Sequence, residues 1–145
     1  MVLRTGCGGT SSVTQTPSTQ TVAFSTSYAS VTTQLEQITK AIGAAVRQAA
    51  GSSNAQLTVE FRDLSSRWQT QLSQLETLRP PPNLTPDFHT LTDAVSRVES
   101  DLNAIVAAAE TNNKAAAEQA GASLILDVAA ARSADAPIRR QAGIK

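Results

Sequence analysis

The residues of this chain that could bind a metal or catalyse a reaction are few and widely spaced. His89 is the single histidine and Met1 the single methionine. Helical haem and di-iron proteins need paired His, Met or Glu-x-x-His ligands that point inward from facing helices. No Glu-x-x-His occurs in the sequence. We therefore expect no metal and no cofactor, and we expect His89 to lie at the surface or at the rim of a core.

The carboxylates also lack the pattern expected for acid–base catalysis. They occur singly and fall off the apolar positions of the helices described below: Glu60, Asp63, Glu76, Asp87, Asp93, Glu99 and Asp101. Solvent-exposed helix faces explain such positions without general acid–base work. A serine hydrolase would need His89 as its base, and no Gly-x-Ser-x-Gly surrounds any serine. The sequence therefore predicts that the protein is not an enzyme.

Cys7, the single cysteine, stands ahead of a run rich in serine and threonine. It closes the stretch LRTGC, which resembles the lipobox of bacterial lipoproteins, where an aliphatic residue and two small residues precede an invariant cysteine. Thr5 and Gly6 match the small positions, and Arg4 departs from the aliphatic one. The resemblance implies a diacylglycerol on Cys7 and cleavage just before it. The basic and apolar segments of a secretion signal do not precede Cys7, so we expect residues 1–6 to be the remnant of a signal.

Residues 8–27 carry no charge and few apolar side chains, too few to offset the entropy of ordering the backbone. We therefore expect residues 1–27 to form a disordered tail, in which the tether of about 20 residues after Cys7 has a reach of roughly 25 Å. Together with a lipid on Cys7, this predicts an extracytoplasmic protein anchored to the outer face of a bacterial cell membrane. The alternative is a cytoplasmic protein with an N-terminal tail and an incidental cysteine.

Residues 28–145 contain four windows in which apolar residues recur every three or four positions, as on one face of an α-helix. The stripes from Tyr28 to Ala49 and from Phe88 to Ala109 are unbroken, and the last stripe consists mostly of small side chains. Between the windows lie Gly51, a capping-box pair at Ser53 and Gln56, three consecutive prolines, and two asparagines. These patterns predict helices at about 27–50, 54–78, 86–110 and 113–136, with Pro137 ending or kinking the last.

Helices of these lengths, joined by short connections, pack antiparallel to their neighbours. We therefore expect an all-α, antiparallel up-down-up-down four-helix bundle over residues 28–145, in the form of a monomer. A dimer of two-helix hairpins would show the same apolar stripes. No apolar run approaches the roughly 18 residues that a transmembrane helix needs.

The second stripe is interrupted at Gln71, where an apolar residue is due after Trp68. An indole beside a polar gap, opposite the small side chains of the fourth helix, would leave room for a pocket. If such a pocket exists, we expect Trp68, Gln71 and Leu72 to line it. The alternative, which the pattern favours, turns Leu72 inward and leaves Gln71 at the rim.

The charges are balanced, with 12 Lys and Arg against 12 Asp and Glu. A chain of zero formal charge, with no basic patch interleaved with aromatic residues, gives little support to nucleic-acid binding. We therefore predict a non-enzymatic binding or protein-interaction module of the cell envelope, whose protein partner the sequence does not identify. The alternative is a carrier or sensor of a small apolar ligand or lipid, with its cavity near Trp68.

Overall fold

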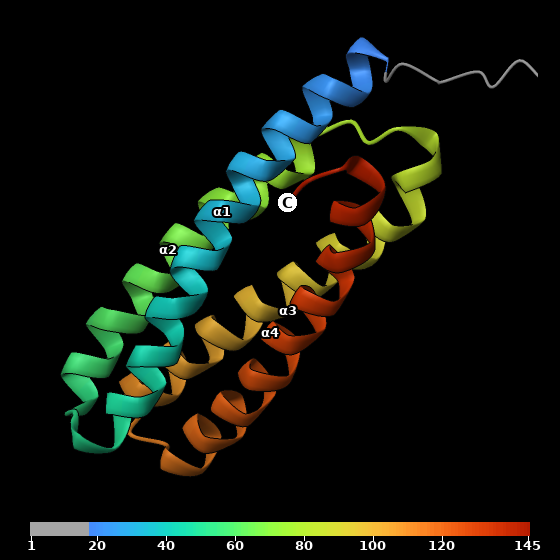
Figure 1. Ribbon diagram of the computed structural model, residues 1–145. Coiled ribbons are helices and arrows are strands. Elements are labelled where there is room, and N and C mark those ends of the chain that lie inside the picture. The colour runs from blue at the N-terminus through green and yellow to red at the C-terminus, as the bar shows by residue number, and fades with distance from the viewer. Residues whose placement is uncertain (1–17) are drawn as a thin grey trace, which may run out of the picture.

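The computed structural model describes residues 18–145, which form four long helices (Figure 1). The helices are α1 (Thr19–Gln48), α2 (Asn54–Thr77), α3 (Thr85–Glu110) and α4 (Lys114–Ala142), with one-turn 3-10 helices η1 (Ala49–Gly51) and η2 (Pro82–Leu84) in the first two connections. The chain reverses direction at each connection, which gives the up-down-up-down order. The predicted all-α four-helix fold is confirmed, and residues 18–145 contain no strand.

Capping residues in the sequence set the helix starts. Gln56 N donates to Ser53 Oγ at 3.2 Å, and Ser53 N donates to the Gln56 side chain at 2.9 Å, so the predicted capping box is present. At the start of α4 it is Asn113, not Asn112, that accepts a hydrogen bond from Ala116 N, at 3.1 Å. These side chains satisfy N–H groups that have no partner inside the helix. The starts of α2 and α4 are therefore encoded locally.

The apolar stripes pack into one core that contains residues from all four helices. Its largest fully buried side chains are Trp68, Tyr28, Phe61, Leu75, Leu84 and Leu91. Burying each such side chain contributes roughly 1.5–3 kcal/mol before the entropy of folding is subtracted. Across residues 18–145, no helix combines the length and apolar character needed to cross a bilayer.

The expected boundary between tether and bundle near residue 27 is wrong, because α1 begins at Thr19. Ser18 caps the helix by accepting from Thr21 N at 3.2 Å. Phe24 is 4% exposed, stacks on Tyr28 and meets Phe88 edge to face, with ring centroids 5.4 and 5.8 Å apart. This aromatic contact offsets the cost of ordering the preceding turns. Residues 1–17, including the rest of the expected tether and Cys7, lie outside the described residues.

The expected end of the fourth helix at residue 136 is also wrong, because α4 continues through Pro137 to Ala142. A proline inside a helix removes one backbone hydrogen bond and costs about 3 kcal/mol. Here Ile138 is fully buried, and the side chains of Asp135 and Arg139, on either side of Pro137, form hydrogen bonds with α1. Tertiary contacts of the last turns therefore outweigh the local preference to stop.

The four helices are not packed equally. α2 lies along α1, α3 along α2, and α4 along α3, whereas α1 and α4 approach each other at few positions. In Figure 1 the ribbons of α1 and α4 lie apart along most of this seam. The seam between the first and last helices is therefore the open side of the bundle.

Replacing Phe24 by alanine tests the corrected start of the bundle. We expect the free energy of unfolding to fall by about 3 kcal/mol, because the substitution leaves a cavity between Tyr28 and Phe88. Urea denaturation followed by circular dichroism measures the change. Val22→Ala is the matched control, since Val22 is 51% exposed and its loss should cost less than about 0.5 kcal/mol. Equal effects of the two substitutions would show that this segment does not pack on the bundle.

Candidate functional site

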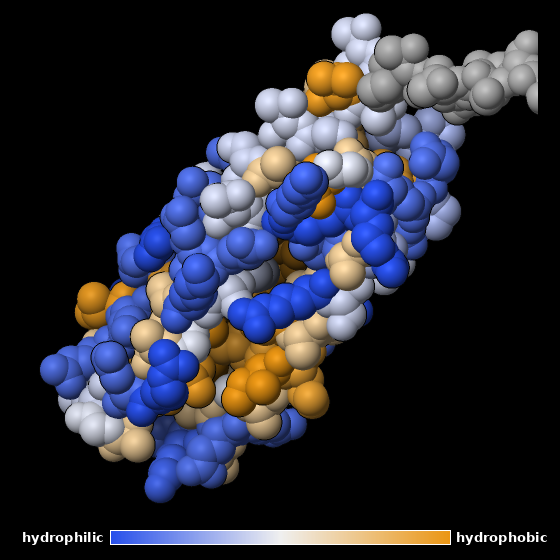
Figure 2. All heavy atoms as spheres, viewed as in Figure 1, coloured by the Kyte–Doolittle hydropathy of each residue, from blue (hydrophilic) through white to orange (hydrophobic). Residues whose placement is uncertain are grey.

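The open seam between α1 and α4 contains two adjoining hollows, of about 310 and 490 Å³. Thr39, Val128 and Arg132 line both, so the hollows form one continuous depression, here called the α1–α4 groove. Its apolar walls are formed by Leu35, Ile42, Val46, Leu124, Val128 and Ala131. In Figure 2 apolar atoms are visible in a hollow between two margins of hydrophilic residues. The groove is thus apolar inside and polar along its edges.

The deep wall of the first hollow comes from the bundle core. Trp68 of α2 and Leu91 and Val95 of α3 line it, each at most 2% exposed. Trp68 Nε1 donates to the carbonyl oxygen of Val95 at 2.8 Å, which satisfies the buried indole and fixes the orientation of its ring. The base of the groove is therefore rigidly held.

The structure places the three predicted pocket residues in different environments. Trp68 lines the groove, whereas Gln71 and Leu72 line neither hollow, so that part of the expectation is wrong. Leu72 is 6% exposed and lies in the core, which agrees with the alternative in which Leu72 turns inward. Gln71 is half-buried, and its Oε1 is buried with no hydrogen-bond partner among residues 18–145. The size of the pocket depends on the distance between α1 and α4. The sequence of α2, which contains the three predicted residues, gives no information about that distance.

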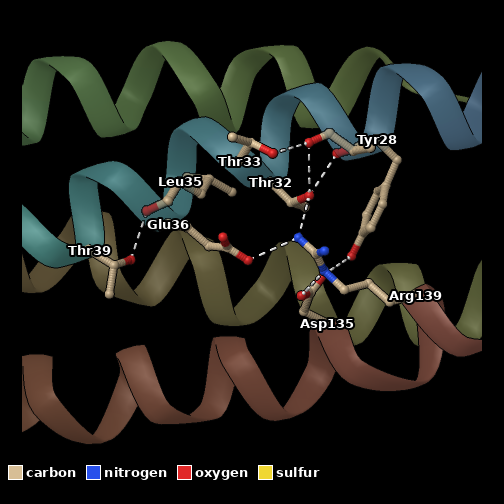
Figure 3. A network of polar contacts seen from close by, with 9 residues as sticks. Tyr28, Thr32, Thr33, Leu35, Glu36, Thr39, Asp135 and Arg139 are labelled. Carbon is tan, nitrogen blue, oxygen red and sulfur yellow. Dashed lines mark hydrogen bonds and ion pairs between the residues drawn. The ribbon is translucent and has the colours of Figure 1, made fainter. Parts of the chain in front are cut away.

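One end of the groove is closed by a polar cluster between the N-terminal half of α1 and the C-terminal half of α4 (Figure 3). Tyr28 Oη donates to Asp135 Oδ1 at 2.5 Å, and Arg139 Nε donates to Asp135 Oδ2 at 2.6 Å. Arg139 Nη2 donates to Thr32 Oγ1 at 3.1 Å and to Glu36 Oε1 at 3.0 Å. We call these five residues the polar cluster. Three of them, Thr32, Glu36 and Asp135, also line the first hollow, so the cluster forms its end wall.

The electrostatics of the polar cluster favour a fixed arrangement over proton transfer. Burial raises the pKa of Tyr28 far above its ordinary value, and the hydrogen bond to Asp135 acts in the same direction. Burial lowers the pKa of Arg139, but its hydrogen bond to Asp135 and the charges of Asp135 and Glu36 outweigh this and leave the pKa raised. Tyr28 therefore stays a donor and Arg139 stays charged across the physiological pH range. The cluster therefore holds α1 to α4 through a neutral donor and a permanent cation.

A second polar contact joins α3 and α4 outside the groove. Asp101, expected on a solvated face, is half-buried, and its Oδ2 is buried without a hydrogen-bond partner among residues 18–145. Burial raises the pKa of Asp101 to about 6, the neighbouring carboxylate of Asp127 adds to the rise, and Arg97 opposes it. Arg97 Nε lies 3.3 Å from Asp127 Oδ1. Because neither carboxylate lines a hollow of the groove, we interpret the pair as structural.

His89 is exposed, as expected from its position beside the third stripe. In the part of the chain that the structure describes, no three side chains of the His, Cys, Asp and Glu types gather as a metal site would require. The α1–α4 groove is a hollow of residues 18–145 whose size would allow a small ligand to bind.

The Asp101 carboxyl predicts a pH-dependent stability. Its pKa is raised in the folded state from 3.8 to about 6, so the folded protein binds more protons than the unfolded chain within that window. The free energy of unfolding must then fall as the pH rises through the window. Asp101→Asn removes one of the two negative charges that Asp101 and Asp127 place side by side. We expect this substitution to stabilise the protein by about 1–3 kcal/mol near neutral pH.

Urea denaturation at a series of pH values measures the effect. The gain should disappear below about pH 4, where Asp101 is protonated in both states. Asp93→Asn, at an exposed position of the same helix, serves as the control for the loss of a surface carboxylate. A gain from Asp101→Asn that is the same at all pH values would contradict the assignment.

The comparisons with known proteins identify no family for this chain. The sequence matches no protein-family model, and no curated protein or solved structure matches it either.

Proposed function

We propose that the helical domain is a non-enzymatic binding module that takes an elongated apolar ligand, an acyl chain, into the α1–α4 groove. The observation that carries this proposal is the apolar lining between α1 and α4, which reaches down to the core residues Trp68, Leu91 and Val95. Both hollows fall in the range of about 300–1,000 Å³ that is usual for small-ligand sites. This favours the carrier function over the general protein-interaction module.

The shape of the groove favours a chain-like ligand. Its two hollows share residues at Thr39 and Val128, so they follow one another along the helices. A linear alkyl chain contacts apolar residues on both walls, and each buried methylene contributes about 0.8 kcal/mol. A chain of about ten carbons therefore gains enough free energy to exceed the cost of ordering it.

The carboxylates and hydroxyl groups of the groove are engaged in ways that support binding without catalysis. Glu36 and Asp135 are paired with Arg139. The hydroxyl groups of Thr32 and Thr39 donate to carbonyl oxygens of their own helix, at 2.9 and 2.8 Å. No nucleophile lies beside a free base among the residues that line the two hollows.

Gly43 offers a direct test, because it lines the second hollow on α1. A Cβ at this position meets just Arg47 Nη1, at 3.4 Å, so a larger side chain fits and extends into the groove. We expect Gly43→Leu to weaken binding of dodecanol at least tenfold in titration calorimetry, because leucine occupies the space of the alkyl chain. The same substitution should leave the fold intact or stabilise it, since glycine inside a helix costs roughly 0.5–1 kcal/mol.

The matched control is Gly121→Leu in α4. Gly121 is also helical, has no atom near its Cβ position and lies outside both hollows. It should bind dodecanol as the unaltered protein does. Failure of dodecanol to bind the unaltered protein, or equal binding by the Gly43 variant, would refute the proposed function.

We also propose that this module belongs to a lipid-anchored protein of the bacterial cell envelope. Support comes from the sequence at Cys7, which is outside the described residues, and from its resemblance to a lipobox. A diacylglycerol on Cys7 would hold the module at the membrane surface, where acyl chains are supplied.

Mass spectrometry of the N-terminal peptide of the protein from its native host tests the anchor. We expect a chain that begins at Cys7 and carries the mass of a diacylglycerol, and we expect Cys7→Ala to move the protein out of the membrane fraction. A peptide in which residues 1–6 still precede an unmodified Cys7 would contradict the assignment.

A further inference from the structure

The margins of the α1–α4 groove carry three cationic side chains without an anionic partner. Lys40 and Arg47 of α1 and Arg132 of α4 line the hollows and are exposed. None of them forms an ion pair or a side-chain hydrogen bond with any other residue of the described range 18–145. The formal charge of the whole chain is zero, so this excess of positive charge is a local feature of the groove.

The anionic residues of the groove do not compensate these charges. Glu36 and Asp135 are the carboxylates among the lining residues of the two hollows. Both are bonded to Arg139, at 3.0 and 2.6 Å. Because Arg139 already balances part of their charge, the remaining field over the groove is positive.

The cations are arranged around one point of the groove. Lys40 and Arg132 line the first hollow from opposite walls, and Arg132 also lines the second hollow. Arg47 lies in the second hollow, where its Nη1 is 3.4 Å from the Cβ position of Gly43 and so lies against the α1 wall. A negative group held between Lys40 and Arg132 would therefore stand where the two hollows join, with Arg47 adding to the attraction.

We infer that the groove selects a long-chain carboxylate, that is a free fatty acid, with its carboxylate between Lys40 and Arg132. The alkyl chain then follows the second hollow, between Ile42 and Val46 of α1 and Leu124 of α4. Ammonium and guanidinium groups donate charge-assisted hydrogen bonds to a carboxylate. The single row of hollows suits one alkyl chain, and this inference rests on the proposed acyl-binding function.

The experiment compares three ligands with a twelve-carbon chain: laurate, dodecanol and dodecyltrimethylammonium. Laurate and the ammonium ligand are titrated calorimetrically below their micelle concentrations, and dodecanol below its solubility limit. We expect laurate to bind roughly tenfold more tightly than dodecanol and the cationic ligand to bind most weakly. The preference for laurate should decrease as salt is added, because the cations are exposed.

The double variant Lys40→Gln/Arg132→Gln tests the position of the carboxylate. Its affinity for laurate should fall to that of dodecanol, and its affinity for dodecanol should not change, which also shows that the groove is intact. Arg140→Gln is the matched control, because Arg140 is an exposed cation of α4 that lines neither hollow. It should bind all three ligands as the unaltered protein does.

The outcomes separate this inference from the proposed function. If none of the three ligands binds, the acyl-binding function itself is refuted. If dodecanol binds as tightly as laurate, or if the double variant keeps the preference for laurate, the function stands and the selection of a carboxylate by Lys40 and Arg132 is overturned.

Discussion

The hydrogen bonds that Asp135 accepts from Tyr28 and Arg139 are the connection on which the open groove depends. α1 and α2, α2 and α3, and α3 and α4 pack along their lengths, whereas α1 approaches α4 at few positions. The polar cluster holds the first and last helices together at one end and leaves them separate beyond it. Directional hydrogen bonds fix one geometry where an apolar seam would allow the helices to slide. The groove is therefore a consequence of where this one polar contact lies.

Much of the fold follows from local patterns, because apolar periodicity reports which face of a helix is buried. Val98, Leu102 and Ile105, which belong to the third stripe, are buried as their spacing predicts. Ser53 caps the start of α2, as the capping box predicts. The predicted start near residue 27 omits the first turns of α1, although the sequence contains a signal for them. Phe24 stands four positions before Tyr28 and so extends the same stripe, but the polar residues around it resembled a linker.

The groove and the polar cluster could not have been predicted in the same way. Tyr28 and Asp135 are 107 positions apart, and no local pattern relates a tyrosine on one helix to an aspartate on another. Periodicity within α1 and α4 shows that Leu35 and Val128 are on apolar faces, but it does not show how far apart two faces lie. The continuation of α4 beyond Pro137 is likewise not predictable from a local pattern. It depends on the contacts of Ile138 and Arg139 with the rest of the bundle, which override a strong local preference.

An open apolar groove couples ligand binding to the stability of this fold. Val128 and Ala131 are half-buried on the side of α4 that faces α1, so part of the apolar burial available to a closed four-helix bundle is not realised. A ligand that lies between α1 and α4 supplies the missing contacts to both helices and binds the folded state alone. Mass action then stabilises the protein in proportion to the logarithm of ligand concentration over Kd. The incomplete seam that costs stability is thus the same feature that would give the proposed acyl ligand its binding energy.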